Sequence, residues 1–393
     1  MKKKKASLHE LQGPLNRRSL LCRFFTPRRS TVPKMFFQGR GALGLPGIAL
    51  LMQGFCSFKS GDILKLRFIS RAAALLTLAG LAVPAAAADP AADYPTRPIT
   101  LLVGFPAGGP SDTAARILAH QLEGELPGAR VVVENRGGAN GTLAAAALTK
   151  APADGHTLFL VTKSHVNTKW LYRHLPFDPA TDFQPVAVLL TMPNVLVVGP
   201  SIHAPDYQAF AADARQHPDE YTVFSTGNGS DPHLAAEEFQ EKTALKFRHI
   251  PYKGGAQGMV DMLSGRVDLS FATLGTVMGY LADGRSQVRA LALGGAQRDP
   301  LLPDVPTFAE VGVAGFEPMA WYGVMAPVGT PRPILEKLNQ AINHAMNQPE
   351  GVAMLHKMGA SPAHTSIEEF TELYQNDIKT NGELIRHLGV TLD

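Results

Sequence analysis

Two glycine-bearing loops hold the residues whose types and spacing are best suited to binding a ligand. They read Phe105-Pro-Ala-Gly-Gly-Pro-Ser-Asp112 and Ser225-Thr-Gly-Asn-Gly-Ser-Asp-Pro-His233. Each follows a short apolar run and precedes a segment with helical spacing, so each is predicted to lead from a strand into the N-terminus of a helix. Glycine lets backbone N–H groups approach a ligand, and a helix N-terminus carries a partial positive charge. Such loops suit a carboxylate or a phosphate.

The polar residues that end the first loop can shape it. Ser111 or Asp112 is in position to cap the helix that follows and to hold the loop in one conformation. The alternative for this loop is an ordinary connection between a strand and a capped helix, with no ligand involved.

The second loop repeats this design further along the chain. Asp231 fits the N-cap of a helix with Pro232 at the first helical position, where a missing N–H costs nothing. Further hydrogen-bonding groups come from Thr226, Asn228, Ser230 and His233. For His233 alone, a packed or solvent-exposed histidine is the alternative. Two loops of one design favour a binding site over a coincidence.

Motifs of common enzyme classes do not support catalysis. Neither loop carries Gly-x-Gly-x-x-Gly, and the chain has no phosphate-binding Gly-x-x-x-x-Gly-Lys-Ser/Thr, no Gly-x-Ser-x-Gly and no His-Glu-x-x-His. His156, His165 and His174 are spaced by nine, which places no two of them on one helical turn. We therefore expect no enzyme, no cofactor and no metal site.

Strands alternating with helices must position these loops. Expected strands are 99–105, 131–133, 156–162, 195–198, 221–225, 249–250, 267–271 and 288–293, and expected helices are 112–126, 142–150, 232–243, 255–263, 334–346 and 367–378. The last helix opens with the capping box Ser366-x-x-Glu369. Such alternation predicts a parallel sheet. We expect lobe 1 over 94–195 plus 321–393 and lobe 2 over 196–320, with a ligand cleft between them.

Charge is distributed unevenly along the 393 residues. The formal net charge is +3, but residues 1–88 contain 15 Lys and Arg against two acids. Residues 89–393 keep 22 Lys and Arg against 32 Asp and Glu, a net charge of −10. An acidic body argues against nucleic acid as a partner.

An export signal is predicted over residues 64–88. Lys65, Arg67 and Arg71 precede an apolar stretch, 72–83, and a small-residue cleavage site, 84–88. Residues 1–63 show no sustained periodicity and are expected to be a disordered upstream extension, with a twin-arginine signal at 17–18 as the rival interpretation. Both cysteines lie before the predicted cleavage site, so no disulfide is expected in the mature protein. The mature protein is predicted to work in the periplasm.

A set of short motifs gives this chain a resemblance to a known family. They are Tyr94-Pro-Thr-Arg-Pro-Ile-Thr, Pro106-Ala-Gly-Gly-x-x-Asp112, Val133-Glu-Asn-Arg-x-Gly-Ala139, Ala153-Asp-Gly-His-Thr157, Pro251-Tyr-Lys-Gly-Gly255, Asp304-Val-Pro-Thr-Phe-Ala-Glu310, Trp321-Tyr-Gly323 and Ala326-Pro-Val-Gly-Thr-Pro331. In this order they resemble the tripartite tricarboxylate transporter substrate-binding proteins, also called the Bug receptors. The resemblance extends from about residue 94 to 393.

The resemblance implies an α/β fold of two Rossmann-like lobes in the Venus-flytrap architecture of periplasmic binding proteins. It implies a monomeric receptor that captures a small carboxylate: a di- or tricarboxylate, an acidic amino acid or an aromatic acid. Its partners would be the integral membrane subunits of a transporter, with a membrane sensor kinase as the alternative. The two loops would act as pincers on carboxylate groups.

Two positions depart from the family pattern. Asn140 stands where glycine is common, and because asparagine tolerates the left-handed conformation the fold should be unaffected. Lys163 stands beside Ser164 where small or apolar residues are usual, and it either faces solvent or favours a second carboxylate. The candidate ligand-binding residues are Phe105, Ala107, Gly108, Gly109, Ser111, Asp112, Lys163, Ser164, Thr226, Gly227, Asn228, Gly229, Ser230, His233 and Thr273.

Overall fold

The computed structural model describes residues 89–283 and 287–392. The predicted upstream extension, 1–63, and the predicted export signal, 64–88, lie outside the described residues. Both stay predictions.

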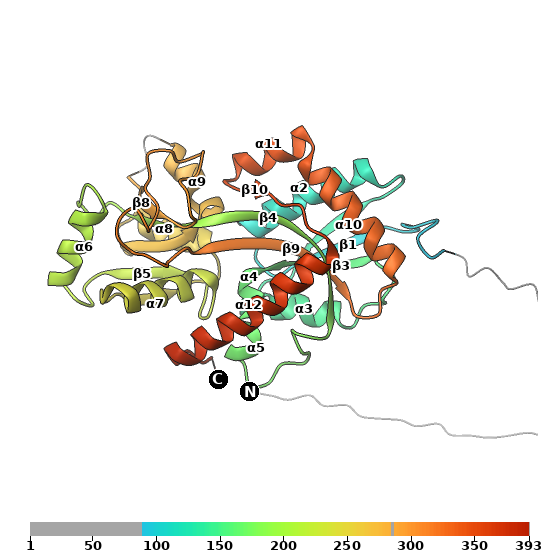
Figure 1. Ribbon diagram of the computed structural model, residues 1–393, viewed down its shortest axis with the longest axis horizontal. Coiled ribbons are helices and arrows are strands. Elements are labelled where there is room, and N and C mark those ends of the chain that lie inside the picture. The colour runs from blue at the N-terminus through green and yellow to red at the C-terminus, as the bar shows by residue number, and fades with distance from the viewer. Residues whose placement is uncertain (1–88, 284–286, 393) are drawn as a thin grey trace, which may run out of the picture. The chain divides into compact units, whose positions relative to one another are not determined.

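A mixed sheet runs through the described part of the chain (Figure 1). Its strands follow the order β2-β1-β3-β9-β4-β7-β5-β6, and β8 and β10 also pair with β4. The bounds are β1 Ile99–Val103, β2 Val131–Asn135, β3 Thr157–Thr162, β4 Phe183–Val198, β5 Thr222–Ser225, β6 Arg248–Pro251, β7 Leu269–Thr273, β8 Arg289–Leu293, β9 Met319–Pro327 and β10 Ser361–Pro362. β1 pairs in parallel with β2 and β3, and β5 pairs in parallel with β6 and β7.

β4 divides this sheet into two parts. From Phe183 to Pro193 it pairs antiparallel with β9, and from Asn194 to Val198 it pairs antiparallel with β7. We call β1, β2, β3, β9, β10 and β4 up to Pro193 the first half-sheet. We call β5 to β8 and β4 from Asn194 the second half-sheet. The lobe bounds expected from the sequence, 94–195 plus 321–393 and 196–320, stay a prediction.

Helices cover both faces of each half-sheet (Figure 1). Around the first half-sheet lie α2 Pro110–Glu125, α3 Thr142–Leu148, α4 Lys163–Val166, α5 Thr168–Leu171, α10 Arg332–Asn347, α11 Pro349–Lys357 and α12 Ile367–Leu388. Around the second lie α6 Tyr207–Gln216, α7 Asp231–Thr243, α8 Gly255–Leu263 and α9 Leu274–Ala282. Within the described ranges no helix has the length and apolar character needed to cross a membrane.

The hydrophobic core is divided in the same way as the sheet. Under the first half-sheet, Leu101 and Leu338 belong to a buried cluster that ends along β4 at Met192. Under the second half-sheet, Phe239 and Phe271 pack with ring centroids 4.8 Å apart inside a separate cluster. Burying a side chain of this kind stabilises the fold by about 1.5–3 kcal/mol. Each half of the molecule is therefore stabilised by a core of its own.

The structure corrects several expected elements. The strand expected over 195–198 is the end of the much longer β4, and β4 and β9 run antiparallel, so the sheet is mixed rather than parallel. Pro185, which interrupts the strand pattern in the sequence, lies at a register shift where its missing N–H is tolerated. The sequence also did not predict α6 and α9, or the extension of α12 from Ile378 to Leu388.

Candidate ligand-binding site

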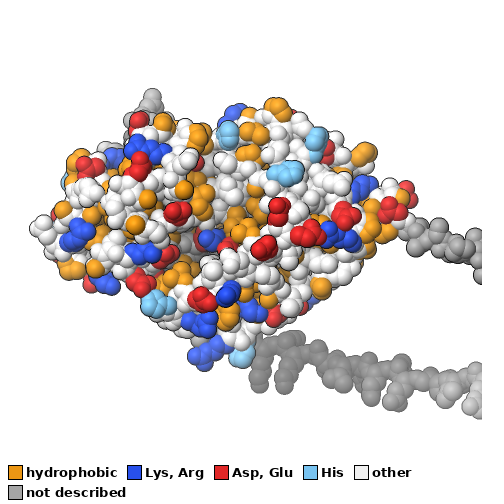
Figure 2. Space-filling view, in the orientation of Figure 1, with side chains coloured by type: hydrophobic (Ala, Val, Ile, Leu, Met, Phe, Trp, Pro, Cys, Tyr) orange, Lys and Arg blue, Asp and Glu red, His pale blue; other side chains and the backbone are white. Residues whose placement is uncertain are grey.

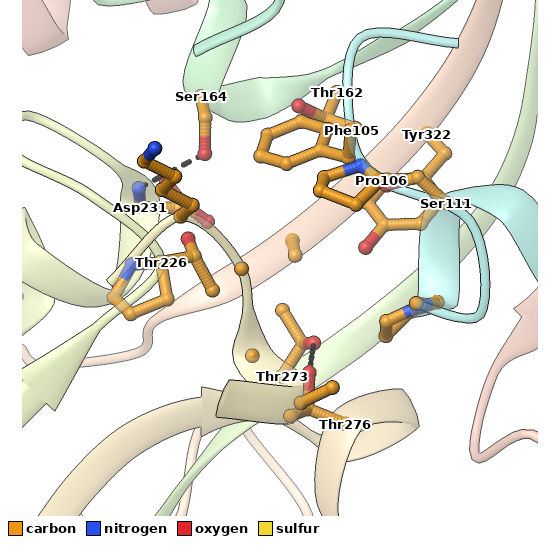
Figure 3. A pocket seen from close by; sticks show the side chains of 18 of the residues that line it. Phe105, Pro106, Ser111, Thr162, Ser164, Thr226, Asp231, Thr273, Thr276 and Tyr322 are labelled. Atoms are coloured by element: carbon orange, nitrogen blue, oxygen red, sulfur yellow. Dashed lines mark hydrogen bonds between the residues drawn. The ribbon is translucent and has the colours of Figure 1, made fainter. Parts of the chain in front are cut away.

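A central cavity of about 270 Å³ lies where both half-sheets end their parallel strands. Its walls come from the segments that directly follow β1, β3, β5, β6 and β7, together with β9. The carboxyl ends of parallel strands are where open α/β sheets place their ligands. Figure 3 shows Phe105, Ser111 and Tyr322 on one side of the cavity and Thr226 and Asp231 on the opposite side.

Four helices of nine or more residues begin at this cavity, as does the short α4. Residues of the first turns or N-caps of the four longer helices line it: Gly109, Pro110 and Ser111 of α2, Asp231 and Pro232 of α7, Gly254 and Gly255 of α8, and Thr273 and Thr276 of α9. The first N–H groups of a helix have no partner within the helix, and its N-terminus carries about half a positive charge. Four such ends around one cavity favour an anion.

Among the lining residues that the structure describes, three carry charged side chains: Lys163, Asp231 and Lys253. Lys163 is half-buried, and its Nζ donates to the carbonyl oxygen of Met319 over 3.1 Å. Lys163 therefore lines the cavity, and its contact with a second carboxylate stays a prediction. Lys253 is exposed at the rim.

Tyr322 is a lining residue that sequence reasoning missed. Burial raises the pKa of its phenol to about 12, so the hydroxyl stays protonated and able to donate. Its hydroxyl lies near Ser111 and Thr273, whose side chains oppose this shift. Ala320 and Tyr322 both line the cavity, which is the alternation of a strand with one face toward the ligand. The run 319–327 is apolar throughout and hides this alternation, so the motif Trp321-Tyr-Gly323 was the local signal that could have pointed to Tyr322.

The first loop is held in shape by Asp112. Its Oδ2 accepts the N–H of Gly108 over 3.0 Å and the Nε–H of Arg116 over 3.0 Å. Partial burial opposes ionisation of Asp112, but these hydrogen bonds outweigh it and lower the pKa of the carboxyl group. α2 begins at Pro110 without a side-chain cap, so Asp112 fastens the loop rather than capping the helix as expected. Gly108 has φ of 83°, which suits glycine.

The second loop is partly held by histidines from its own half of the molecule, that is, the second half-sheet and the helices around it. The N–H of Gly229 donates to Nδ1 of His233 over 3.0 Å. The ring of His233 stacks on His249 with centroids 3.9 Å apart, and Nε2 of His249 lies 2.6 Å from Oγ of Ser225. Burial, with a further contribution from His233, lowers the pKa of His249 to about 4. His233 thus supports the loop from outside the central cavity.

Two asparagines from around the first half-sheet also hold the second loop. Nδ2 of Asn140 donates to the carbonyl oxygen of Asn228 over 2.8 Å. Nδ2 of Asn167, which is fully buried, donates to the carbonyl oxygen of Gly229 over 3.0 Å. Asn140 has φ of 53°, the left-handed conformation that asparagine tolerates.

A third hydrogen bond and an apolar contact join the same two parts. The N–H of Asp231 donates to Oγ of Ser164 over 3.0 Å (Figure 3). Leu171 lies so close to Gly229 that a Cβ there would meet its Cδ1 at 2.0 Å. Glycine is therefore required at position 229 by close packing as well as by its φ of 69°.

The structure brings many of the predicted site residues together. Lining the central cavity are Phe105, Ala107, Gly109, Ser111, Lys163, Ser164, Thr226 and Thr273. Gly227 and Asn228 line a neighbouring cavity of about 470 Å³. The predicted residues that line neither of these two cavities are Gly108, Asp112, Gly229, Ser230 and His233. Ligand binding by the predicted residues stays a prediction.

One face of the molecule and the acids of the described residues bear on what other kinds of site require. The face in Figure 2 carries Asp, Glu, Lys and Arg side chains interspersed, and it is hollowed between the part around α6 to α9 and the part around α10 and α12. Over the described ranges, no group of three or more His, Cys, Asp or Glu is placed to hold a metal ion.

Known proteins resemble this chain over most of its length. The sequence profile of the tripartite tricarboxylate transporter family receptor matches residues 114–390. The solved structure of the periplasmic binding protein BugD is 30% identical, with a TM-score of 0.71, and the match covers 76% of this chain and 100% of BugD. The mixed α/β architecture is therefore that of the periplasmic binding proteins.

Two further solved structures carry ligands. Rpa4515 of R. palustris with adipate is 35% identical, with a TM-score of 0.73, over 76% of this chain and 100% of that one. MatC of Rhodopseudomonas palustris with bound malate is 31% identical, with a TM-score of 0.69, over 74% of this chain and 100% of that one. Both ligands are small dicarboxylates.

Proposed function

Because the chain belongs to the tripartite tricarboxylate transporter receptor family, whose members are periplasmic solute-binding receptors and not enzymes, we propose that it captures a small carboxylate for a membrane transporter of that type. The receptor would work in the periplasm after removal of the export signal predicted over 64–88. The ligand would be released unchanged to the membrane subunits.

One observation carries the proposal: the N-termini of α2, α7, α8 and α9 all meet the central cavity. Helix N-termini can stabilise carboxylate oxygens without the cost of moving a counter-ion into the site. Hydroxyl donors stand among them, including Ser111 and Tyr322, and Lys163 adds a positive charge. This arrangement stabilises negative charge.

The neighbours with bound adipate and malate support a ligand of similar size. A cavity of about 270 Å³ has room for such a molecule and also for an acidic amino acid or a small aromatic acid. Hydrogen bonds to a charged group contribute about 1.5–3 kcal/mol each, so three or four suffice for micromolar affinity, about −8 kcal/mol, after ordering costs.

The test compares each acid with its own methyl ester. Ligands are first screened by thermal shift, since a ligand that binds the native state alone stabilises it by RT ln(1 + [L]/Kd). The best acid and its ester are then titrated by calorimetry. We expect esterification to remove most of the affinity, because an ester cannot supply the anionic oxygens. Equal affinities for acid and ester would refute carboxylate recognition by these helix ends.

The transport role needs a separate measurement. Uptake of the best-bound acid, labelled with carbon-14, is followed in cells with and without the gene. We expect uptake to fall to background without the receptor and to return when it is restored. If the purified receptor binds the acid but cells without the gene take it up as fast as before, the receptor serves an output other than transport.

A further inference from the structure

Asp231 is the single acidic side chain among the described residues that line the central cavity. It is the first residue of α7, and only 9% of its surface is exposed. Its backbone N–H is bound by Ser164, but its side-chain Oδ2 has no hydrogen-bond partner. A carboxylate in the wall of a cavity that otherwise suits anions would repel an anionic ligand, so its presence needs an explanation.

Leaving this carboxylate unpartnered is unfavourable. A buried charged group needs a partner to offset the loss of water. Burial raises the pKa of Asp231, and Asp377 adds to that effect, while Lys163 and Asn194 only partly oppose it. Over the described residues, no ion pair joins Asp231 to Lys163, whose Nζ is bound to Met319. The protein itself therefore does not supply a full partner.

The missing partner must come from the ligand side. Asp231 and Lys163 also line a smaller cavity of about 150 Å³, but its other charged residues are Glu238 and Glu317. These are acids and would repel the carboxylate further. While ionised they donate no hydrogen bond to Asp231, and the central cavity is the larger of the two spaces beside it in which a ligand donor fits.

We propose that Asp231 accepts a hydrogen bond from an ammonium or hydroxyl group that the ligand carries beside its carboxylate, so that the receptor selects α-amino or α-hydroxy acids over the unsubstituted acid. The N–H of Asp231 is taken by Ser164, so the positive charge beside this acid comes from Lys163, which lines the same cavity. A carboxylate paired with Lys163 has its neighbouring carbon within reach of Asp231. Lys163 and Asp231 together present opposite charges to the two groups.

This inference rests on the proposed function and narrows its ligand class. It is tested with three matched series: succinate, malate and aspartate; glutarate, 2-hydroxyglutarate and glutamate; phenylacetate, mandelate and phenylglycine. Within each series only the group on the carbon next to the carboxylate changes. Dissociation constants are measured by calorimetry on the exported, processed protein. In any series that binds, the amino or hydroxy acid should bind at least about tenfold tighter than the unsubstituted acid.

Variants of Asp231 test whether this residue causes the preference for amino and hydroxy acids. In Asp231→Asn we expect the ammonium preference to fall about tenfold while the unsubstituted acid binds equally well or more tightly, because a repelling charge is gone. Asp377→Asn is the matched control: it also removes an acid near Asp231, but Asp377 is half-buried and accepts a hydrogen bond from Trp321 rather than lining the cavity. It should preserve the wild-type order. Asp231→Ser is a second variant in case Asp231→Asn does not fold. The ranking of acids by the wild-type protein tests the proposal even if neither variant folds.

The outcomes separate the two levels of the argument. Unsubstituted acids that bind as tightly as their amino and hydroxy analogues would overturn the role of Asp231 and leave carboxylate binding intact. So would an Asp231→Asn protein that loses affinity for every acid equally. If no acid of any series binds, the proposed function itself fails.

Discussion

The two glycine-bearing loops face one cavity, yet they are held by different parts of the molecule. The first loop is fastened from within its own half, by Asp112 and by the side chain of Asn135, which donates to the carbonyl oxygen of Phe105 over 3.1 Å. The second loop belongs by sequence to the second half but is bound by Asn140 and Asn167 of the first.

This difference predicts separate roles. If the two halves move apart to admit a ligand, the contacts of the first loop persist, whereas those between the second loop and the first half must break. Apparent affinity falls with the fraction of molecules in the binding-competent state. Changes in the first loop should therefore act on the shape of the site, and changes at the second loop should act on the population of the closed form.

The largest effect is expected from Asn167→Ala. Asn167 is fully buried, donates to Gly229 and accepts a hydrogen bond from Nδ2 of Asn381 over 2.7 Å. Truncation leaves buried polar groups unsatisfied, at about 1–3 kcal/mol for each group. We expect the dissociation constant to rise about tenfold to a hundredfold in calorimetry, mainly through faster ligand release.

Asn381→Ala is the matched control for this variant. It removes the bond between Asn381 and Asn167 but leaves the bond from Asn167 to the second loop in place. We expect it to lower the melting temperature with a much smaller loss of affinity. If both variants weaken binding equally, the contact with Gly229 does not govern closure, and the contrast between the loops disappears.

A second prediction uses Asp112→Ala to probe the first loop. Loss of a cap-like carboxylate costs about 0.5–2 kcal/mol, and here the N–H of Gly108 loses its partner. Because Gly108 is exposed, water can replace that partner, so folding should suffer little. We expect affinity to fall severalfold, through slower association into a less ordered loop. An unchanged dissociation constant would show that Asp112 has no part in ligand binding.

Local signals in the sequence were enough to predict many elements of the fold. α8 has the predicted bounds, Gly255–Leu263, and the capping box at Ser366 and Glu369 is formed in both directions. The long β4 was not predicted, because its residues are buried on both faces and show no alternation. Its prolines, Pro185 and Pro193, also suggested breaks, and only its distant partner strands make it a strand.

The candidate site shows the same division between local and distant causes. Glycines and helix starts marked both loops because turn and cap chemistry is local. Asn167 is separated from Gly229 by 62 positions and Asn140 from Asn228 by 88 positions, and no local pattern specifies such contacts. Tyr322 entered the site because β9 returns beside β3, which depends on the whole sheet.

A third prediction uses pH, because each half contains a histidine whose pKa is lowered, His165 in the first and His249 in the second. Burial lowers the pKa of His165 to about 4, and burial and His233 do the same for His249. Unfolded histidine titrates near pH 6.5, so the unfolded chain binds more protons between about pH 6.5 and 4. The stabilisation by these neutral rings is complete above pH 6.5 and is lost as the pH falls through that window.

The expected size is modest at His249, which is partly exposed: about 0.5–1 kcal/mol per pH unit after solvent screening. Melting curves and titrations at pH 7, 6 and 5 test it. His249→Gln should flatten the pH dependence of both stability and affinity, since His249 contacts Ser225 at the second loop. His165→Phe should flatten that of stability alone, because His165 packs among Phe159, Phe177 and Phe183. Identical behaviour of the two variants would contradict the special place of the second loop.

The smallest effect is expected from Asn140→Gly, and it gives the cleanest test of the comparison. Glycine adopts the left-handed backbone of position 140 without strain, so the change removes the bond to Asn228 and little else. Asn228 is exposed, so water replaces part of that bond and the loss should be about 0.5–1 kcal/mol, a two- to fivefold weaker affinity. The melting temperature of the unliganded protein should hardly move, because Asn140 supports no core packing. Asn140→Asp, which keeps the side-chain volume but cannot donate, should weaken binding at least as much as the glycine variant, because its carboxylate would face the carbonyl oxygen of Asn228. If Asn140→Gly binds as tightly as the wild type while Asn167→Ala is weakened, the first half holds the second loop through its buried contact alone, and the departure from glycine at position 140 has no bearing on closure.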